Sequence, residues 1–328
     1  MTQQAIATSQ TNSLVTSATT GETTATPFLS ETVEISEALQ SYLHDLDLPF
    51  TKMDLEFVNQ LHSRHIARYS FNSLAVVLGQ EMPLDLPHLI DKIVKRGLGG
   101  YCFEHNKLSF ELLKALGFKV RLLLARVIYN QEKDVPRTHR ITLLELDDKA
   151  YIVDTGFGSL GPRHPVELTP GKVQLIGDET FRIQAKAHGE YDLQVIKDGE
   201  FFSLYRFDLN RYTEADCLTG HFFSHRYPQA GFVNNLVVSL KQTDTVFSLR
   251  NHQLFEIHQG ETQITTVADA GHLYLLLSDM FNLPIDRAVA EHLFERFVQP
   301  QLRSTESAEN AEGIENVEKA DSSKKVSQ

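Results

Sequence analysis

Apolar residues recur every three or four positions in the first third of the chain, which is the spacing of one helix face. This pattern predicts a helix over residues 53–66. A shorter helix is expected over 86–95, with Pro87 in its first turn, where proline is tolerated. A third helix is expected over 103–116, followed by a glycine that ends it.

The middle of the chain changes to runs of branched and aromatic residues separated by turn signals, which is typical of strands. After these strands, a last helical region is expected over 273–298, broken at Pro284. Helices followed by strands followed by a helix favour an α+β fold over alternating βαβ units. The predicted strands cover 120–128, 138–146, 150–154, 191–196 and 200–205, with more between 232 and 264.

Composition adds limits on what the protein contacts. Apolar residues make up 41% of the 328 residues and charged residues 23%, as in ordinary globular proteins. The net charge is −12, but six acidic residues and no base precede Lys52, so the central region is nearly balanced. We therefore expect no nucleic-acid partner. Without a leader-like or membrane-spanning apolar run, we also expect no membrane partner and a cytoplasmic location.

Cys102 lies in the run that most clearly indicates chemistry, Arg96-Gly-Leu-Gly-Gly-Tyr-Cys-Phe-Glu-His-Asn106. A glycine pair lets the backbone pass close to another segment, and Cys102 then opens the predicted third helix. The N–H groups at a helix start favour negative charge and so stabilise a thiolate. The alternative is a small buried apolar residue, as most free cysteines are. Cys217 has no such surroundings and is interpreted as structural, and two cysteines form no disulfide framework.

His139 and Asp154 are the candidate base and orienting carboxylate for this cysteine. A tight turn at Asp147-Asp148 would bring Asp154 to within about two residues of the position opposite His139. The register of the strands cannot be read from the sequence, so this pairing is a hypothesis.

Other histidines compete for these roles. His105 is three residues after Cys102 and ranks second as the base, because two groups so close on one helix rarely aim at the same atom. His62 and His65 have the spacing of metal ligands on a helix, but no third ligand is evident, so we favour a helix-surface role and predict no metal site. His221 and His225 either line a cleft or pack among aromatic residues.

Three segments together resemble the arylamine N-acetyltransferase family: Gly99-Gly-Tyr-Cys-Phe-Glu-His-Asn106, Thr138-His139 and Val153-Asp-Thr-Gly-Phe-Gly158. A weaker similarity runs from about 36 to 298. The resemblance implies that Cys102 is the acyl-accepting nucleophile, His139 its base and Asp154 the orienting carboxylate. It also implies an N-terminal helical bundle, a central β-barrel and a C-terminal α/β lid, around a cysteine-protease-like core.

The domain boundaries expected from the residues and the resemblance divide the chain into five parts. The ends, rich in small polar and charged residues, are expected to be disordered. The predicted parts are a disordered extension (1–28), a helical domain with the nucleophile (29–119), the barrel with His139 and Asp154 (120–225), the lid (226–302) and a disordered acidic tail (303–328).

The implied reaction moves an acetyl group from acetyl-CoA, as cosubstrate, to the nitrogen of an arylamine or hydrazine, with no tightly bound cofactor. The alternatives are a cysteine hydrolase or transglutaminase-type enzyme, an N-acyltransferase with another acyl donor, and a non-catalytic binding protein. Weak candidates for binding the cosubstrate are Gly156, Gly158 and Arg226; a Ser-Thr-x-Pro stretch of relatives is His225-Arg-Tyr-Pro228 here.

The chain departs from the family pattern at Asn72 and Leu98 as well. There the family has a glutamate and an arginine thought to pair. Losing both charges together is coherent, since a lone buried charge is costly. We therefore interpret the two residues as a compensated replacement, with Arg96 as another possible anchor.

Overall fold

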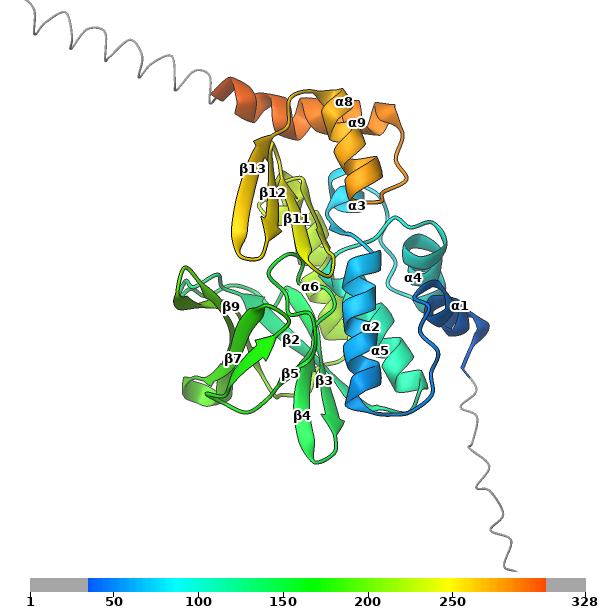
Figure 1. Ribbon diagram of the computed structural model, residues 1–328, viewed down its shortest axis with the longest axis vertical. Helices are drawn as coiled ribbons and strands as arrows, with labels where there is room; N and C mark the ends of the chain where they lie inside the picture. Colours follow the sequence, from blue (N-terminus) through cyan, green and yellow to red (C-terminus); the bar gives the residue numbers. More distant parts are fainter. Residues whose placement is uncertain (1–34, 305–328) are drawn as a thin grey trace, which may run out of the picture. The chain divides into compact units, whose positions relative to one another are not determined.

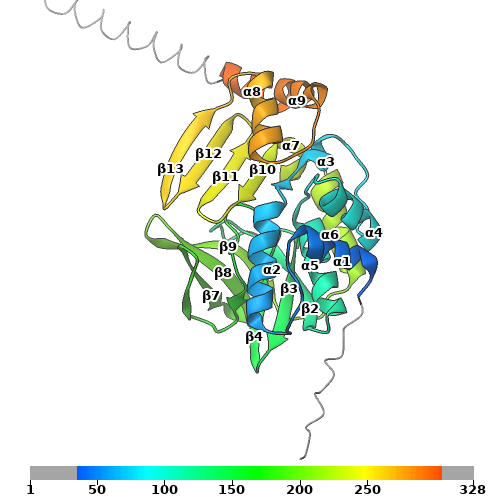
Figure 2. The ribbon, with the colours of Figure 1, turned by 45° about the vertical axis from the view of Figure 1, so that its right-hand side comes forward.

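The computed structural model describes residues 35–304. Its first part is helical (Figures 1 and 2), and aspartate or serine side chains cap the first turns of several helices, as helix starts prefer. α5 carries Cys102 as its first residue. The helices are α1 (Glu37–Asp45), α2 (Leu55–Arg68), α3 (Leu74–Val77), α4 (Leu86–Leu89), which continues in the π-helical turn η1 (Ile90–Lys95), and α5 (Cys102–Ala115).

An eight-stranded antiparallel sheet follows, in the order β5-β4-β3-β2-β9-β8-β7-β6. Its two edge strands are joined by Gln174 of β6, whose side-chain amide exchanges two hydrogen bonds with the backbone of Glu167 in β5. The sheet is thereby nearly closed into a barrel. The strands are β2 (Lys119–Val127), β3 (His139–Leu146), β4 (Lys149–Val153), β5 (Val166–Glu167), β6 (Val173–Ile176), β7 (Glu179–Ala185), β8 (Glu190–Lys197) and β9 (Glu200–Asp208), with a short helix η2 (Ala187–Gly189) before β8.

A five-stranded sheet, ordered β1-β10-β11-β12-β13, makes up the last part together with helices that pack on it. Its edge strand β1 (Phe71–Asn72) comes from the helical part of the chain, so this sheet reaches the segment that pairs with the Cys102 loop. The remaining elements are α6 (Glu214–Arg226), α7 (Gly231–Asn234), β10 (Val237–Lys241), β11 (Thr245–Arg250), β12 (Gln253–His258), β13 (Glu261–Thr266), α8 (Ala270–Leu275), η3 (Leu276–Met280), α9 (Arg287–Leu293) and η4 (Phe294–Val298).

The predicted α+β class is confirmed, with helices, a barrel-like sheet and a second sheet covered by helices. Helix α6 was missing from the sequence prediction, because its apolar residues have no helical period. The signal that indicates it is the capping box formed by Thr213 and Asp216. The predicted domain boundaries stay predictions, and the extension 1–28 and most of the tail 303–328 lie outside the described residues.

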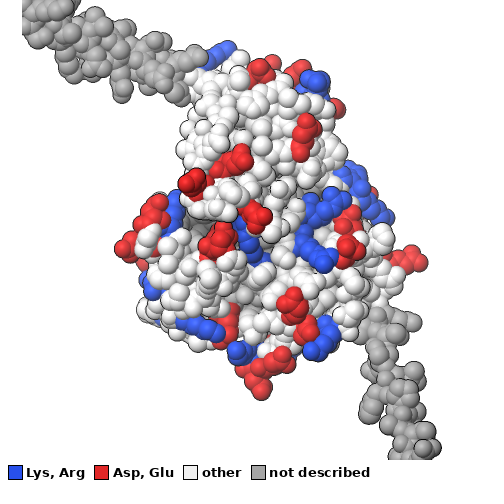
Figure 3. All heavy atoms as spheres, in the orientation of Figure 1, with Lys and Arg blue, Asp and Glu red and all other residues white. Residues whose placement is uncertain are grey.

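Acidic and basic side chains are interspersed on the face drawn in Figure 3, with no broad basic area. The expectation of no nucleic-acid partner stays a prediction. Within residues 35–304, no helix is both long and apolar enough to cross a bilayer.

Candidate active site

Cys102 is placed by a glycine loop that pairs with the segment before α3. The Gly100 N–H donates to Ser70 O (3.2 Å), and the Asn72 N–H donates to Gly100 O (2.6 Å). Gly99 has φ +59°, and a Cβ there would lie 2.1 Å from Ser70 O, so only glycine fits. This close pairing holds the start of α5, and Cys102 itself is buried.

The buried Glu104 stabilises the same loop. Its carboxylate accepts from the Tyr101 N–H (3.2 Å), and its other oxygen is 2.6 Å from Lys92 Nζ in η1. Glu104 is completely buried, and its charge is balanced by that lysine. Sequence reasoning did not identify Lys92, which is ten residues before Cys102 on an ordinary-looking helix.

The two departures from the family pattern touch each other. The Asn72 amide donates to the Leu98 carbonyl (3.0 Å), and its oxygen accepts from the Leu74 N–H (3.1 Å). The position is therefore satisfied without charge, which supports the interpretation as a compensated replacement. Arg96 does not take part, because it pairs with Asp91 at the surface (2.8 Å).

His139 and Asp154 meet as the turn predicted. Thr142 pairs with Val153 across β3 and β4, so the next residue, Asp154, comes two positions from His139. His139 Nε2 is 2.7 Å from Asp154 Oδ2, and both residues are buried. Burial raises the pKa of the Asp154 carboxyl, but His139 and other donors outweigh it and hold the pKa below its ordinary value.

Asn106 is the functional residue that sequence reasoning missed. One helical turn after Cys102, its amide donates to Asp154 Oδ1 (2.8 Å) and to Arg140 O (2.7 Å). Its oxygen accepts from the Thr155 N–H (2.8 Å). One helix thus carries both the thiol and the group that fixes the carboxylate. The i, i+4 spacing on α5 indicates that Asn106 shares a helix face with Cys102, but it does not indicate the contact with Asp154.

The Cys102 thiol lies beside the residue that precedes His139, since its Sγ is 3.5 Å from Thr138 O. Burial raises the pKa of this thiol well above its ordinary value, and the nearby Asp154 carboxylate adds to the shift. The backbone N–H groups of Phe103 and Arg140 lower it only in part. The N–H groups at the helix start therefore do not offset the effect of burial on this thiol, and an adjacent proton acceptor would favour its ionisation.

His105 is not available as that acceptor, because both of its ring nitrogens are used. Its Nε2 faces Gly100 O (3.1 Å), and its Nδ1 is 2.7 Å from His65 Nε2. His65 Nδ1 is in turn 2.5 Å from the Tyr42 hydroxyl. The helix-surface role expected for His62 and His65 is wrong, since both are fully buried. Residues 35–304 contain no cluster of three or more potential metal ligands.

The other candidate histidines lie behind the nucleophile loop. His221 is buried, with its Nδ1 against the Tyr101 hydroxyl and its Nε2 2.9 Å from Met82 O. Packing therefore accounts for His221. His225 lines an open groove of about 360 Å³ together with Arg226 and Arg296.

The three weak candidates for cosubstrate binding do not come together. A Cβ on Gly156 would lie 3.0 Å from Cys102 Cα, so this glycine lets the 154–158 turn pack against the nucleophile. Gly158 lines a cavity of about 20 Å³ beside Asp154. Arg226 lines the groove of His225, and neither Gly156 nor Gly158 lines it. The structure thus associates the glycines, but not Arg226, with the site of Cys102.

Known proteins are similar to this chain in sequence. The family model described as N-acetyltransferase matches residues 54–290. The arylamine N-acetyltransferase of Escherichia coli (strain K12) is 31% identical over 239 residues, covering 72% of this chain and 85% of that protein. The arylamine N-acetyltransferase / N-hydroxyarylamine O-acetyltransferase of Salmonella typhimurium is 32% identical over 235 residues, covering 71% and 83%.

Solved structures agree with the sequence matches. The arylamine N-acetyltransferase from Salmonella typhimurium superposes with a TM-score of 0.76 at 30% identity, over 80% of this chain and all of that one. The Mycobacterium marinum arylamine N-acetyltransferase in complex with CoA gives 0.75 at 28% identity, over 79% and 99%. By sequence and by fold, over most of its length, this chain belongs to the arylamine N-acetyltransferase family.

Proposed function

We propose that this protein transfers an acetyl group from acetyl-CoA to the nitrogen of an arylamine or hydrazine, through an acetyl-cysteine at Cys102. The observation that carries the proposal is the buried His139–Asp154 pair, with the buried Cys102 thiol against the residue that precedes His139. The fold is shared with arylamine N-acetyltransferases, one of them solved with CoA. The cytoplasmic location and the absence of membrane and nucleic-acid partners stay predictions.

In the first half-reaction, the Cys102 thiol gives its proton to His139, and the thiolate attacks the thioester carbonyl carbon. The bond between that carbon and the CoA sulfur breaks, and CoA leaves as a thiol with the proton from His139. Asp154 holds Nε2 of the ring, which leaves Nδ1 to exchange protons with the sulfur atoms. The Cys102 N–H, in the first turn of α5, has no intrahelical acceptor and is a donor for the developing oxyanion.

In the second half-reaction, the acceptor nitrogen attacks the acetyl carbon and loses a proton to His139, and the Cys102 sulfur leaves. The deeply buried thiol explains why the base is required. Burial keeps the free thiol neutral, whereas a thiolate next to an imidazolium is stabilised by the opposite charge.

Intact-mass measurement after mixing with acetyl-CoA tests this proposal. We expect one acetyl adduct, which disappears when an arylamine is added and which Cys102→Ser abolishes. Cys217→Ser is the matched control, because Cys217 is also buried but lies against Arg140 instead of a histidine, and it should keep the adduct. An adduct that survives Cys102→Ser contradicts the proposal. If the wild type forms an acyl adduct only with another acyl thioester, the alternative donor is selected.

A further inference from the structure

The segment after β2 makes an irregular turn at the barrel rim. β9 carries an extra residue at Leu204, where the register with β8 shifts between Leu193 and Gln194. The Leu204 carbonyl accepts from two consecutive N–H groups, those of Ile128 (3.1 Å) and Tyr129 (3.2 Å). Bulges of this kind re-aim a neighbouring side chain and are frequent beside active sites.

Tyr129 and Asn130 both have left-handed backbone conformations, with φ +44° and +59°. Residues other than glycine rarely adopt this region, because the Cβ atom crowds the backbone. Two in succession persist only where the surroundings hold them. Two hydrogen bonds to the Ser203 backbone hold Asn130. Its N–H donates to Ser203 O (2.8 Å), and its side-chain oxygen accepts from the Ser203 N–H (3.3 Å).

The turn presents the Tyr129 ring to the site. Its centroid is 6.0 Å from that of Phe157, and the Phe157 ring is 5.1 Å from that of His139. Tyr129 is 46% exposed, although it continues this aromatic row. An exposed aromatic ring in line with the proposed base is placed to contact a flat acceptor at the rim.

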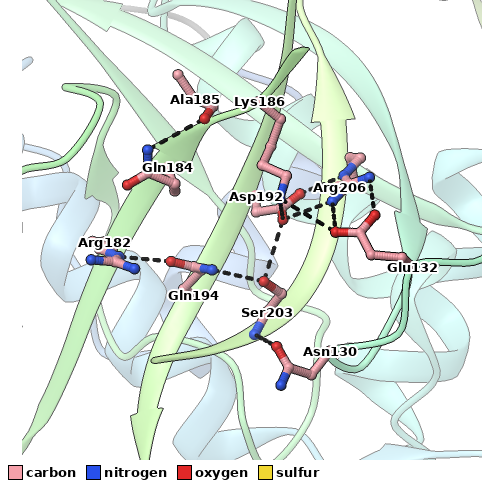
Figure 4. A network of polar contacts seen from close by, with 10 residues as sticks. All are labelled: Asn130, Glu132, Arg182, Gln184, Ala185, Lys186, Asp192, Gln194, Ser203 and Arg206. Atoms are coloured by element: carbon pink, nitrogen blue, oxygen red, sulfur yellow. Dashed lines mark hydrogen bonds and ion pairs between the residues drawn. The ribbon is translucent and has the colours of Figure 1, made fainter. Parts of the chain in front are cut away.

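An ion cluster clamps the same turn two residues further on (Figure 4). Arg206 binds the Glu132 carboxylate with two hydrogen bonds (2.8 and 2.9 Å) and donates through Nε to the buried Asp192 (2.7 Å). Lys186 adds a contact to Glu132 (3.3 Å), and Ser203 donates to Asp192 (3.3 Å). The cluster therefore connects the turn to β8 and β9 in two ways. One is the ion pair of Glu132 with Arg206, and the other is Ser203, which bonds both Asn130 and Asp192.

We propose that the cluster of Glu132, Arg206 and Asp192 is a positioning device that holds Tyr129 at the rim and so favours aromatic acceptors in the second half-reaction. This inference rests on the proposed function. Tyr129 is the specificity-determining residue, and the charged residues act through it. Without Glu132, Arg206 stays on Asp192, but the turn loses its bidentate tie and the left-handed pair relaxes. The Tyr129 ring then no longer extends the row formed by Phe157 and His139.

The test uses enzyme acetylated beforehand and measures loss of the acetyl group with two acceptors, aniline and unsubstituted hydrazine. The ratio of the second-order rate constant for aniline to that for hydrazine isolates the contact with the aromatic ring of the acceptor. For Tyr129→Ala we expect this ratio to fall about 3- to 10-fold, the range for loss of one aromatic contact. For Glu132→Gln we expect a smaller fall in the same direction, with an unchanged rate for hydrazine.

Glu167→Gln is the matched control. Ion-pair partners lower the pKa of both glutamates to about 2: Arg206 and Lys186 for Glu132, and Lys172, with Thr169, for Glu167. Glu167 lies on β5 and does not hold the 129–132 turn. Its substitution should leave the ratio unchanged.

An unchanged ratio in Tyr129→Ala, or equal falls in Glu132→Gln and Glu167→Gln, would overturn the inference. Failure of the wild-type chain to become acetylated would instead contradict the proposed function, so the two failures are distinguishable. Both glutamate variants keep the shape of the side chain, and far-UV circular dichroism confirms that they are folded.

Discussion

Two buried histidine sites adjoin α5, and they differ in what each imidazole contacts. His139 faces a carboxylate, Asp154, at 2.7 Å. His105 faces backbone carbonyls and His65, whose other nitrogen meets the Tyr42 hydroxyl. A carboxylate stabilises an imidazolium. In the hydrogen-bond chain from the Tyr42 hydroxyl to the Gly100 carbonyl, by contrast, each neutral ring donates one hydrogen bond and accepts one. The partner of the imidazole, and not the distance in sequence from Cys102, therefore distinguishes the proposed base from the histidine that we interpret as structural.

The largest effect should come from His139→Gln. Glutamine keeps a hydrogen bond to Asp154 but accepts no proton, so the rate of Cys102 acetylation should fall about 100- to 10,000-fold. Stopped-flow release of CoA thiol measures this rate. His105→Gln, at the other histidine site, should change it less than about 10-fold. Similar losses in the two variants would remove the distinction between the sites.

Acid should destabilise the site of His105 and His65. Burial lowers the pKa of His105 to about 4, and that of His65 falls well below its ordinary value for the same reason. The unfolded chain, with histidine pKa values of about 6.5, binds these protons first. The contribution of these neutral histidines to the free energy of unfolding is therefore complete above about pH 6.5 and is lost as the pH falls towards 4. For His105 the loss is about 3 kcal/mol.

Urea denaturation at pH 4.5 and 7.5 measures this loss. Other buried histidines titrate too, so the informative quantity is the difference between wild type and His105→Leu. The variant should lose less stability on acidification than the wild type does. Equal losses would show that the His65–His105 chain is not held neutral.

A smaller effect is expected from Asn106→Ala. The substitution leaves the buried Arg140 carbonyl, the Thr155 N–H and one Asp154 oxygen without this partner, at a cost of about 1–3 kcal/mol in the free energy of unfolding. Acetylation should slow as well, because Asp154 is held less firmly. Ser109→Ala, one turn along α5, is the control and should slow acetylation little. Equal slowing in the two variants would show that Asn106 does not position Asp154.

The smallest effect is expected from an ion pair far from both histidine sites. Lys119 pairs with Glu145 at the surface. Lys119→Met should change the free energy of unfolding by less than about 1 kcal/mol, since exposed pairs contribute little. Acetylation should be unaffected. A larger change would mean that charge at the barrel surface, and not the buried partners, governs the behaviour of the site.

Local signals in the sequence predicted the parts of this site that depend on short-range geometry. The turn at Asp147-Asp148 predicts that His139 and Asp154 meet, and the glycine pair predicts that the backbone before Cys102 passes close to another segment; both are seen in the structure. The order of helices and strands predicted the α+β class. The resemblance to relatives supplied the bundle, barrel and lid and the acyl-accepting role expected of Cys102.

Contacts between distant segments could not be predicted in this way. Asn106 meets Asp154 across 48 residues, and Lys92 meets Glu104 between two helices. The burial of His65 depends on Tyr42 and His105, which its helix pattern does not show. Such polar contacts have no sequence period, so only the packed structure shows them.

The most direct test of this account is the rate at which iodoacetamide alkylates Cys102 between pH 5 and 9. The rate reports the thiolate, and burial alone would keep Cys102 unreactive at neutral pH. The account predicts rapid alkylation near pH 7 in the wild type and in His105→Gln, and slow alkylation in His139→Gln until the pH is well above 8. If His139→Gln reacts as fast as the wild type at pH 7, His139 is not the group that ionises the cysteine.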